Sequence, residues 1–128
     1  MKIQILLIIT AVLETLTGIS LLLAPALIVQ LLLGSEISTE TEFTICRIAG
    51  SALIALGMIC WLARQDVKSG ASKALVGGLF VYNALVFITL ANSAYTAQTT
   101  PVLIAALIVH LALGIACIFQ LRKYKIPA

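Results

Sequence analysis

Four long apolar stretches dominate the chain and constrain its fold more than any other feature. They cover roughly residues 3–23, 43–63, 74–92 and 101–121, and short polar connections separate them. A helix needs about 20 mostly apolar residues to cross the hydrocarbon core of a bilayer. Each stretch meets that length. The sequence therefore predicts an all-α membrane protein, a bundle of four transmembrane helices in a single domain of residues 1–128.

Composition also favours a membrane protein. Apolar residues make up 62% of the chain and charged residues 10%. In soluble domains, apolar residues make up about 45–50% and charged residues about 25%. A domain of 128 residues cannot bury so much apolar surface in its own core, so lipid has to cover part of it. The net charge of +3 does not indicate nucleic-acid binding, because the basic residues lie in short loops beside apolar segments.

A proline separates the first apolar stretch from a shorter one. Pro25 disfavours a helical conformation at Ala24, and the apolar residues 26–33 are too few to cross a bilayer. We therefore expect a kink or a short interfacial helix after the first span, ending at Gly34. A cleaved signal peptide is the competing interpretation of the N-terminus. However, Glu14 interrupts the apolar run and Pro25 directly follows Ala24, so we treat residues 3–23 as a membrane helix.

The connections between the spans differ in charge. Seven of the eight basic residues lie at the N-terminus, in the second loop or in the C-terminal tail: Lys2, Arg64, Lys68, Lys73, Arg122, Lys123 and Lys125. The first loop instead carries Glu36, Glu40 and Glu42 without a basic residue, and the third is uncharged. Positively charged loops stay on the cytoplasmic side. We therefore expect a protein of the bacterial cytoplasmic (inner) membrane with both termini in the cytoplasm.

Each predicted span contains one polar residue at a depth in the membrane where its burial should cost free energy: Glu14, Arg47, Asn83 and His110. A charge at the bilayer centre costs at least a few kcal/mol, so such residues usually face a bundle interior or a cavity. At about 1.5 Å of rise per residue, Glu14, Asn83 and His110 lie near mid-membrane, whereas Arg47 lies only about 6 Å below the outer end. These four are the candidate ligand-binding or proton-handling residues.

Further small and polar residues lie beside these candidates. Four of them form a supporting polar face: Thr10, Thr17, Ser51 and Tyr82. On the last predicted helix, Ala106, His110, Gly114 and Cys117 share a face, and small residues on such a face let helices approach closely. The pair Gly77-Gly78 is interpreted as either a close-packing patch or a self-association surface.

Each candidate also has a structural interpretation. Glu14 and Arg47 form either an ion pair that holds two helices together or part of a binding site. His110 is either a hydrogen-bonded core residue, a proton relay or ligand contact, or a ligand of haem or metal. Asn83 is expected to link helices. The cysteines lack CxxC spacing and are expected to be small buried hydrophobic residues: Cys46, Cys60 and Cys117.

The segment Arg47-Ile48-Ala49-Gly50, with Gly57 one heptad later and a basic loop after it, resembles the small four-helix DoxX-like membrane proteins. Pro25 after the first helix fits the same outline. The resemblance covers the general architecture of nearly the whole chain, and Arg47 and Gly50 are the positions that it carries over. Some members of that family are associated with quinone-linked redox complexes. The resemblance thus implies an accessory membrane subunit, with a quinone as the alternative cofactor.

Three functions follow from these features. We expect foremost a non-enzymatic membrane module, either an accessory subunit or a bundle that binds a lipid-like ligand, acting as a homo-oligomer or with a membrane partner protein. The alternatives are a quinone-linked redox protein and a small proton-coupled transporter or channel acting as an oligomer. The sequence contains no Ser-His-Asp or Cys-His set, no phosphate loop and no ligand cluster for zinc or iron–sulfur. We therefore predict no catalytic residue, no metal site and no resident cofactor.

Overall fold

The computed structural model describes residues 2–96 and 99–123, and every regular element within these ranges is a helix. The helices are α1 (Ile3–Leu23), α2 (Pro25–Leu33), α3 (Glu40–Ala63), α4 (Gly70–Thr96) and α5 (Pro101–Lys123). All but α2 are long and apolar enough to cross a membrane. The four predicted spans and the short helix after the first are therefore confirmed, although α3 begins earlier than predicted and α4 is longer at both ends.

Local sequence explains where several helices begin and end. Ala24 has φ −139° and ψ 58°, outside the helical region, as expected of a residue before proline. α2 begins at Pro25 and stops at Gly34, whose φ of 67° favours glycine. α3 begins with a capping box: the Glu42 N–H donates to Thr39 Oγ1 at 3.3 Å, and the Thr39 N–H donates to the Glu42 carboxylate at 2.8 Å.

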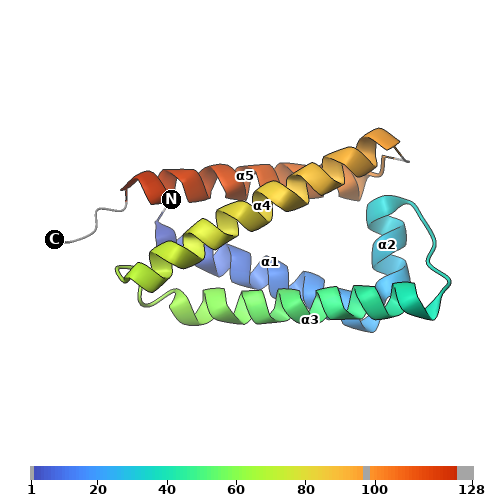
Figure 1. The fold of residues 1–128 in the computed structure, drawn as a ribbon, viewed down its shortest axis with the longest axis horizontal. Coiled ribbons are helices and arrows are strands. Elements are labelled where there is room, and N and C mark those ends of the chain that lie inside the picture. The colour runs from blue at the N-terminus through green and yellow to red at the C-terminus, as the bar shows by residue number, and fades with distance from the viewer. Residues whose placement is uncertain (1, 97–98, 124–128) are drawn as a thin grey trace.

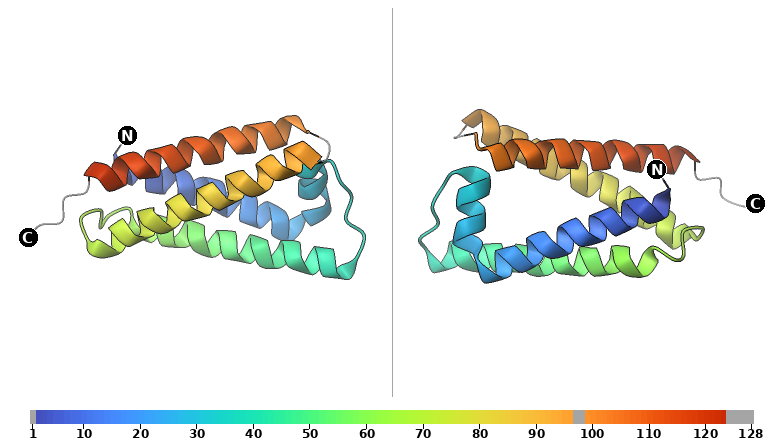
Figure 2. Two further views of the ribbon diagram at one scale, coloured as in Figure 1. Left: turned by 45° about the horizontal axis from the view of Figure 1, so that its top comes forward. Right: turned by 180° about the vertical axis from the view of Figure 1, so that it is seen from behind.

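The long helices form two antiparallel pairs, α1 with α3 and α4 with α5 (Figure 1). The pairs meet at the end of the molecule where α1 begins and α5 ends, and the apolar core lies toward that end. It consists of Leu6, Leu7, Ala11, Cys60, Val76, Leu79, Leu113 and Cys117. At the opposite end, α2 lies crosswise between the pairs (Figure 2), where the Thr100 hydroxyl donates to the carbonyl oxygen of Leu32 at 2.9 Å.

The α1–α3 pair packs backbone against backbone through glycine. A Cβ atom added to Gly18 would lie 2.5 Å from the carbonyl oxygen of Gly50, and one added to Gly50 would lie 2.7 Å from that of Gly18. A Cβ atom on Gly57 would meet Thr15 and Ala11 in the same way. Small residues allow this close approach between membrane helices. The two helices therefore form a contact that a larger side chain at these positions would separate.

The Gly77-Gly78 pair does not make such a contact. An added Cβ atom at either position meets no other atom of the described residues within 4 Å. The prediction of a close-packing patch is therefore wrong within this chain. The alternative, a self-association surface, stays a prediction.

Large apolar side chains cover the outside of the bundle. Ile48 is 64% exposed and Leu62 is 68% exposed, and many other aliphatic side chains on the long helices are similarly uncovered. Contiguous apolar surface of this extent marks a protein that is covered by lipid or by a partner. Together with the four apolar helices, it indicates an integral membrane protein. The start of α1 and the end of α5 lie at the same end of the bundle (Figure 1), while the side of the membrane that they face stays a prediction.

Candidate functional site

A hydrogen bond between α1 and α4 joins the two helix pairs near their middle. The Tyr82 hydroxyl donates to Glu14 Oε2 at 2.9 Å. Glu14 is only 4% exposed, so its carboxyl group lies inside the bundle, as expected of an ionisable residue in a span. The sequence assigned Tyr82 only a supporting role. Its place beside mid-membrane Asn83 was the signal that could have identified it as the partner of Glu14.

A second hydrogen bond joins α4 to α5 at the same level. Asn83 is completely buried, and its Oδ1 lies 2.9 Å from His110 Nδ1. Its Nδ2 donates to the carbonyl oxygen of Leu79, one turn earlier on α4, at 2.8 Å. Asn83 therefore links two helices, the role expected from its sequence position. A buried amide has to find partners for both of its ends, and here it finds them within its own helix pair.

An aromatic contact brings the two hydrogen bonds together. The rings of Tyr82 and His110 meet edge to face, with centroids 5.9 Å apart and an interplanar angle of 75°. Edge-to-face geometry is a favourable arrangement for aromatic rings. Glu14, Tyr82, Asn83 and His110 thus form one contiguous set from three helices, here called the mid-membrane polar cluster. It contains three of the four residues that the sequence singled out.

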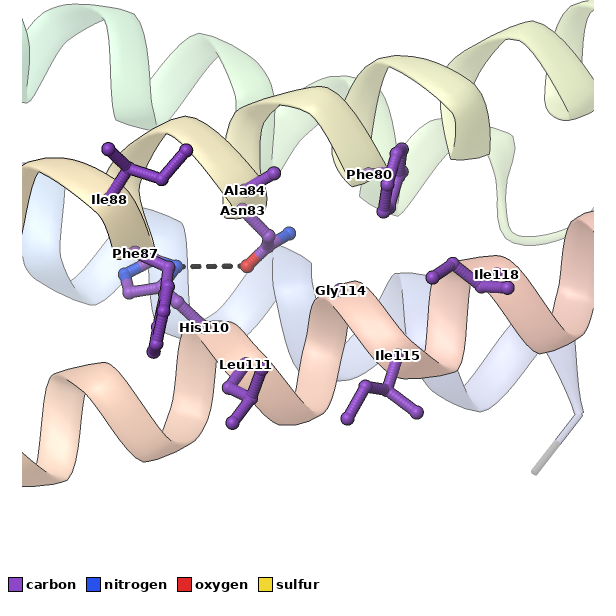
Figure 3. Close-up of a pocket in the computed structure, with 10 residues that line it drawn as sticks. All are labelled: Phe80, Asn83, Ala84, Phe87, Ile88, His110, Leu111, Gly114, Ile115 and Ile118. Carbon is purple, nitrogen blue, oxygen red and sulfur yellow. Dashed lines mark hydrogen bonds between the residues drawn. The ribbon is translucent and has the colours of Figure 1, made fainter.

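The polar cluster reaches the outside of the bundle at a groove between α4 and α5 (Figure 3). This α4–α5 groove has a volume of about 230 Å³. It is lined by Phe80, Asn83, Ala84, Phe87, Ile88, His110, Leu111, Gly114, Ile115 and Ile118. All of these except Asn83 and His110 are apolar or glycine. In Figure 3 α1 and α3 lie behind the groove, and Ile88 on its wall is 62% exposed, so the groove opens on the outer surface of the bundle.

Another open depression lies on the α1–α3 pair. Its volume is about 370 Å³, and its lining comprises Ala11, Val12, Thr15, Leu16, Gly57, Met58 and Trp61. None of these side chains is ionisable, and none belongs to the polar cluster. The larger depression therefore offers mainly apolar surface, whereas the α4–α5 groove combines apolar walls with an amide and an imidazole.

Arg47 lies apart from the polar cluster. Its side chain is exposed on α3, and its guanidinium carbon lies 6.0 Å from the centroid of the Phe43 ring on the same helix. It forms no ion pair within the described ranges. The structure thus does not pair it with Glu14, which bonds to Tyr82 instead. A long basic side chain near the end of a span can extend to the membrane interface, so this exposure needs no buried partner.

The remaining supporting residues divide between the inside and the outside. Thr10 is completely buried one turn before Glu14, and its Oγ1 has no hydrogen-bond partner among the residues that the structure describes. Thr17 and Ser51 are exposed, and the Ser51 hydroxyl donates to the carbonyl oxygen of Arg47 at 2.9 Å. Thr10 and Tyr82 therefore accompany Glu14 inside the bundle, whereas Thr17 and Ser51 do not.

The cysteines are free thiols. Cys60 and Cys117 are buried in the apolar core, and Cys46 is partly buried. In the described part of the chain, no group of three or more His, Cys, Asp or Glu side chains is placed to hold a metal ion.

In comparisons with known proteins, no family model, curated protein or solved structure matches the chain. The resemblance to DoxX-like proteins, and the quinone-linked role that it implies, thus stay predictions. The geometry of the polar cluster and the groove is what bears on function.

Proposed function

We propose that this protein is a non-enzymatic membrane module that binds a lipid-like ligand in the α4–α5 groove. The observation that carries the proposal is the placement of His110. It belongs to the polar cluster and, with Asn83, lines a groove that is otherwise apolar and opens outward. Sites for small apolar ligands are typically concave and apolar, with a few placed polar groups that orient the ligand. A chain from the surrounding bilayer could enter such a groove from the side.

The hydrogen bonds of the cluster support this function by holding the groove in one shape. Glu14 and Tyr82 tie α4 to α1, while Asn83 and His110 tie α5 to α4. A site whose walls are held before the ligand arrives loses less conformational entropy on binding. We place this function in a bacterial cytoplasmic membrane with both termini inside, on the basis of the loop charges.

Photo-cross-linking tests the proposal on the full chain in lipid nanodiscs. The probe is a lipid whose acyl chain carries a diazirine, and the labelled positions are mapped by mass spectrometry. We expect labels to concentrate on groove residues such as Phe87, Ile88 and Leu111. Labels spread evenly over the exposed apolar faces, including Ile48 and Leu62 on α3, would contradict a specific site.

Two matched substitutions make this test sharper. Ala84 lines the groove, whereas Ala105 is exposed on α5 outside it. Ala84→Leu should fill part of the groove and lower labelling there severalfold, and Ala105→Leu should leave labelling unchanged. Equal labelling in both variants would count against the groove.

Native mass spectrometry with an absorbance spectrum separates the proposed function from its alternatives. A co-purifying lipid would support the ligand-binding module. A quinone or a visible chromophore would instead favour a redox role, and a partner complex with an empty groove would favour an accessory subunit.

A further inference from the structure

The hydrogen bonds of Asn83 determine which nitrogen of His110 carries the hydrogen. Asn83 Nδ2 donates to the carbonyl oxygen of Leu79, so the Oδ1 end of the amide faces His110. An amide oxygen can only accept. His110 Nδ1 must therefore be the donor in this bond. Reversing the amide would set Oδ1 against the Leu79 carbonyl oxygen, placing two acceptors at hydrogen-bond distance.

The second ring nitrogen of His110 is then a free acceptor. Figure 3 shows it on the side of the ring away from Asn83, and within the described part of the chain Nε2 has no hydrogen-bond partner. A neutral imidazole with its hydrogen on Nδ1 accepts at Nε2. A cationic ring would place an unpaired charge against the apolar walls of the groove, which is unfavourable inside a membrane. Because His110 lines the groove, Nε2 is the imidazole atom that remains to accept a hydrogen bond from a ligand there.

The depth of His110 restricts the polar group that can reach it. His110 lies about 13 Å below the outer end of α5, inside the hydrocarbon region. A phosphate or carboxylate drawn to that depth would lose its hydration as an ion, which costs far more than the desolvation of a hydroxyl group. A hydrogen bond to Nε2 offsets most of the cost for a hydroxyl. Depth and acceptor together favour a neutral donor at the polar end of the ligand.

We propose that the α4–α5 groove binds a long-chain lipid alcohol, with the alcohol hydroxyl donating to His110 Nε2. The chain would lie along apolar side chains that line the groove, such as Phe87 and Ile88. The volume of about 230 Å³ holds the hydroxyl end and the adjoining methylene groups, and the open side of the groove lets the rest of the chain continue into the bilayer. This inference rests on the proposed function, because it names the ligand class for the same groove.

Nitrogen NMR of His110 tests the acceptor directly. His110 is the only histidine in the chain, so ¹⁵N-histidine labelling reports on a single imidazole. In ligand-free protein we expect a protonated Nδ1 and an unprotonated Nε2. Hexadecanol should shift the Nε2 resonance saturably, whereas hexadecyl methyl ether, which has no donor, should not. A proton on Nε2 in the free protein, or an equal shift with the ether, overturns the proposal.

Cross-linking with diazirine derivatives of the same two compounds separates this inference from the proposed function. We expect the groove to bind the alcohol about fivefold more tightly than the ether, the preference that one neutral hydrogen bond supplies. Equal labelling of the groove by both compounds would overturn the alcohol specificity and leave lipid binding intact. Labelling by neither would overturn both.

The variant His110→Phe keeps a flat ring in the groove and removes the acceptor. It should lose the preference for the alcohol, so that the alcohol and the ether label its groove equally. A preference that persists in His110→Phe would overturn the role of Nε2. Should this variant fail to fold, the comparison of alcohol with ether on the wild-type protein still decides the question.

Discussion

The two helix pairs are held together by different means. α1 and α3 touch through their backbones at Gly18, Gly50 and Gly57, where an added Cβ atom would overlap the facing helix. α4 and α5 touch instead through side chains, among them Asn83 and His110, which form a hydrogen bond. Apolar contact gains little in lipid, so membrane helices associate by close packing and by polar bonds. The α1–α3 pair shows close backbone packing, whereas the α4–α5 pair shows a polar bond in addition to its apolar contacts.

This difference distinguishes a glycine-packed helix pair, here called the scaffold, from the pair that contains the candidate site. Backbone contact between α1 and α3 needs no ionisable group, and the depression on that pair has none in its lining. Side-chain contact between α4 and α5 leaves a groove whose lining contains the imidazole of His110. The bond from Glu14 to Tyr82 connects the two pairs, so the scaffold also positions the site.

The largest expected effect on stability distinguishes Gly50, which packs against the facing helix, from Gly78, which does not. Gly50→Leu should lower the free energy of unfolding by about 3 kcal/mol, the upper part of the usual range for overpacking. The atom that the new side chain meets is the backbone carbonyl oxygen of Gly18, which can shift only if the whole helix moves. Gly78→Leu should change it little, because an added Cβ there meets no described atom. Unfolding by sodium dodecyl sulfate in mixed micelles measures both. Equal losses would mean that the two pairs do not differ as described.

The next effect concerns the bond between the pairs. Glu14→Ala should cost about 2 kcal/mol of unfolding free energy, because it leaves the Tyr82 hydroxyl without its partner. Glu40→Ala, at an exposed position at the start of α3, is the matched control and should hardly change the free energy of unfolding. Glu14→Gln keeps an acceptor and should retain most of the stability. Identical thermal stability of the two alanine variants in detergent would show that Glu14 does not join the pairs.

A smaller effect is expected where α2 meets α5. Thr100 donates to Leu32 and also accepts from the N–H of Leu103 at the start of α5. Thr100→Val should therefore cost about 1 kcal/mol, as for the loss of an N-cap, and should speed hydrogen exchange in α2. Thr100→Ser, which keeps the hydroxyl, is the control. Unchanged exchange in the valine variant would mean that α2 is held by other contacts.

The smallest effect belongs to the polar bond inside the second pair. The coupling energy between Asn83 and His110, from a double-mutant cycle with Asn83→Leu and His110→Phe, should be about 0.6 kcal/mol, the average for hydrogen bonds between membrane helices. Unfolding in mixed micelles again gives the value. An energy as large as the loss of unfolding free energy in Gly50→Leu would mean that the α4–α5 bond stabilises the protein as much as the α1–α3 glycine packing does. The two pairs would then not differ in the way described.

The sequence by itself determined the membrane spans and the break after the first one. Bilayer thickness imposes a length that can be counted along the chain, and Pro25 and Gly34 act through their own backbone preferences. The cost of a polar group in hydrocarbon also singled out Glu14, Asn83 and His110, which the structure brings into one cluster.

Only the tertiary structure decided which helices pair and which side chains meet. Helices that are apolar on all sides carry little periodic signal for the face that turns inward. The sequence therefore could not separate inward Thr10 from outward Thr17, nor place Arg47 away from Glu14. The partnership of Glu14 with Tyr82 and the groove beside His110 depend on the rotation of each helix about its axis. That rotation is set by contacts between segments far apart in the chain, such as Gly18 against Gly50.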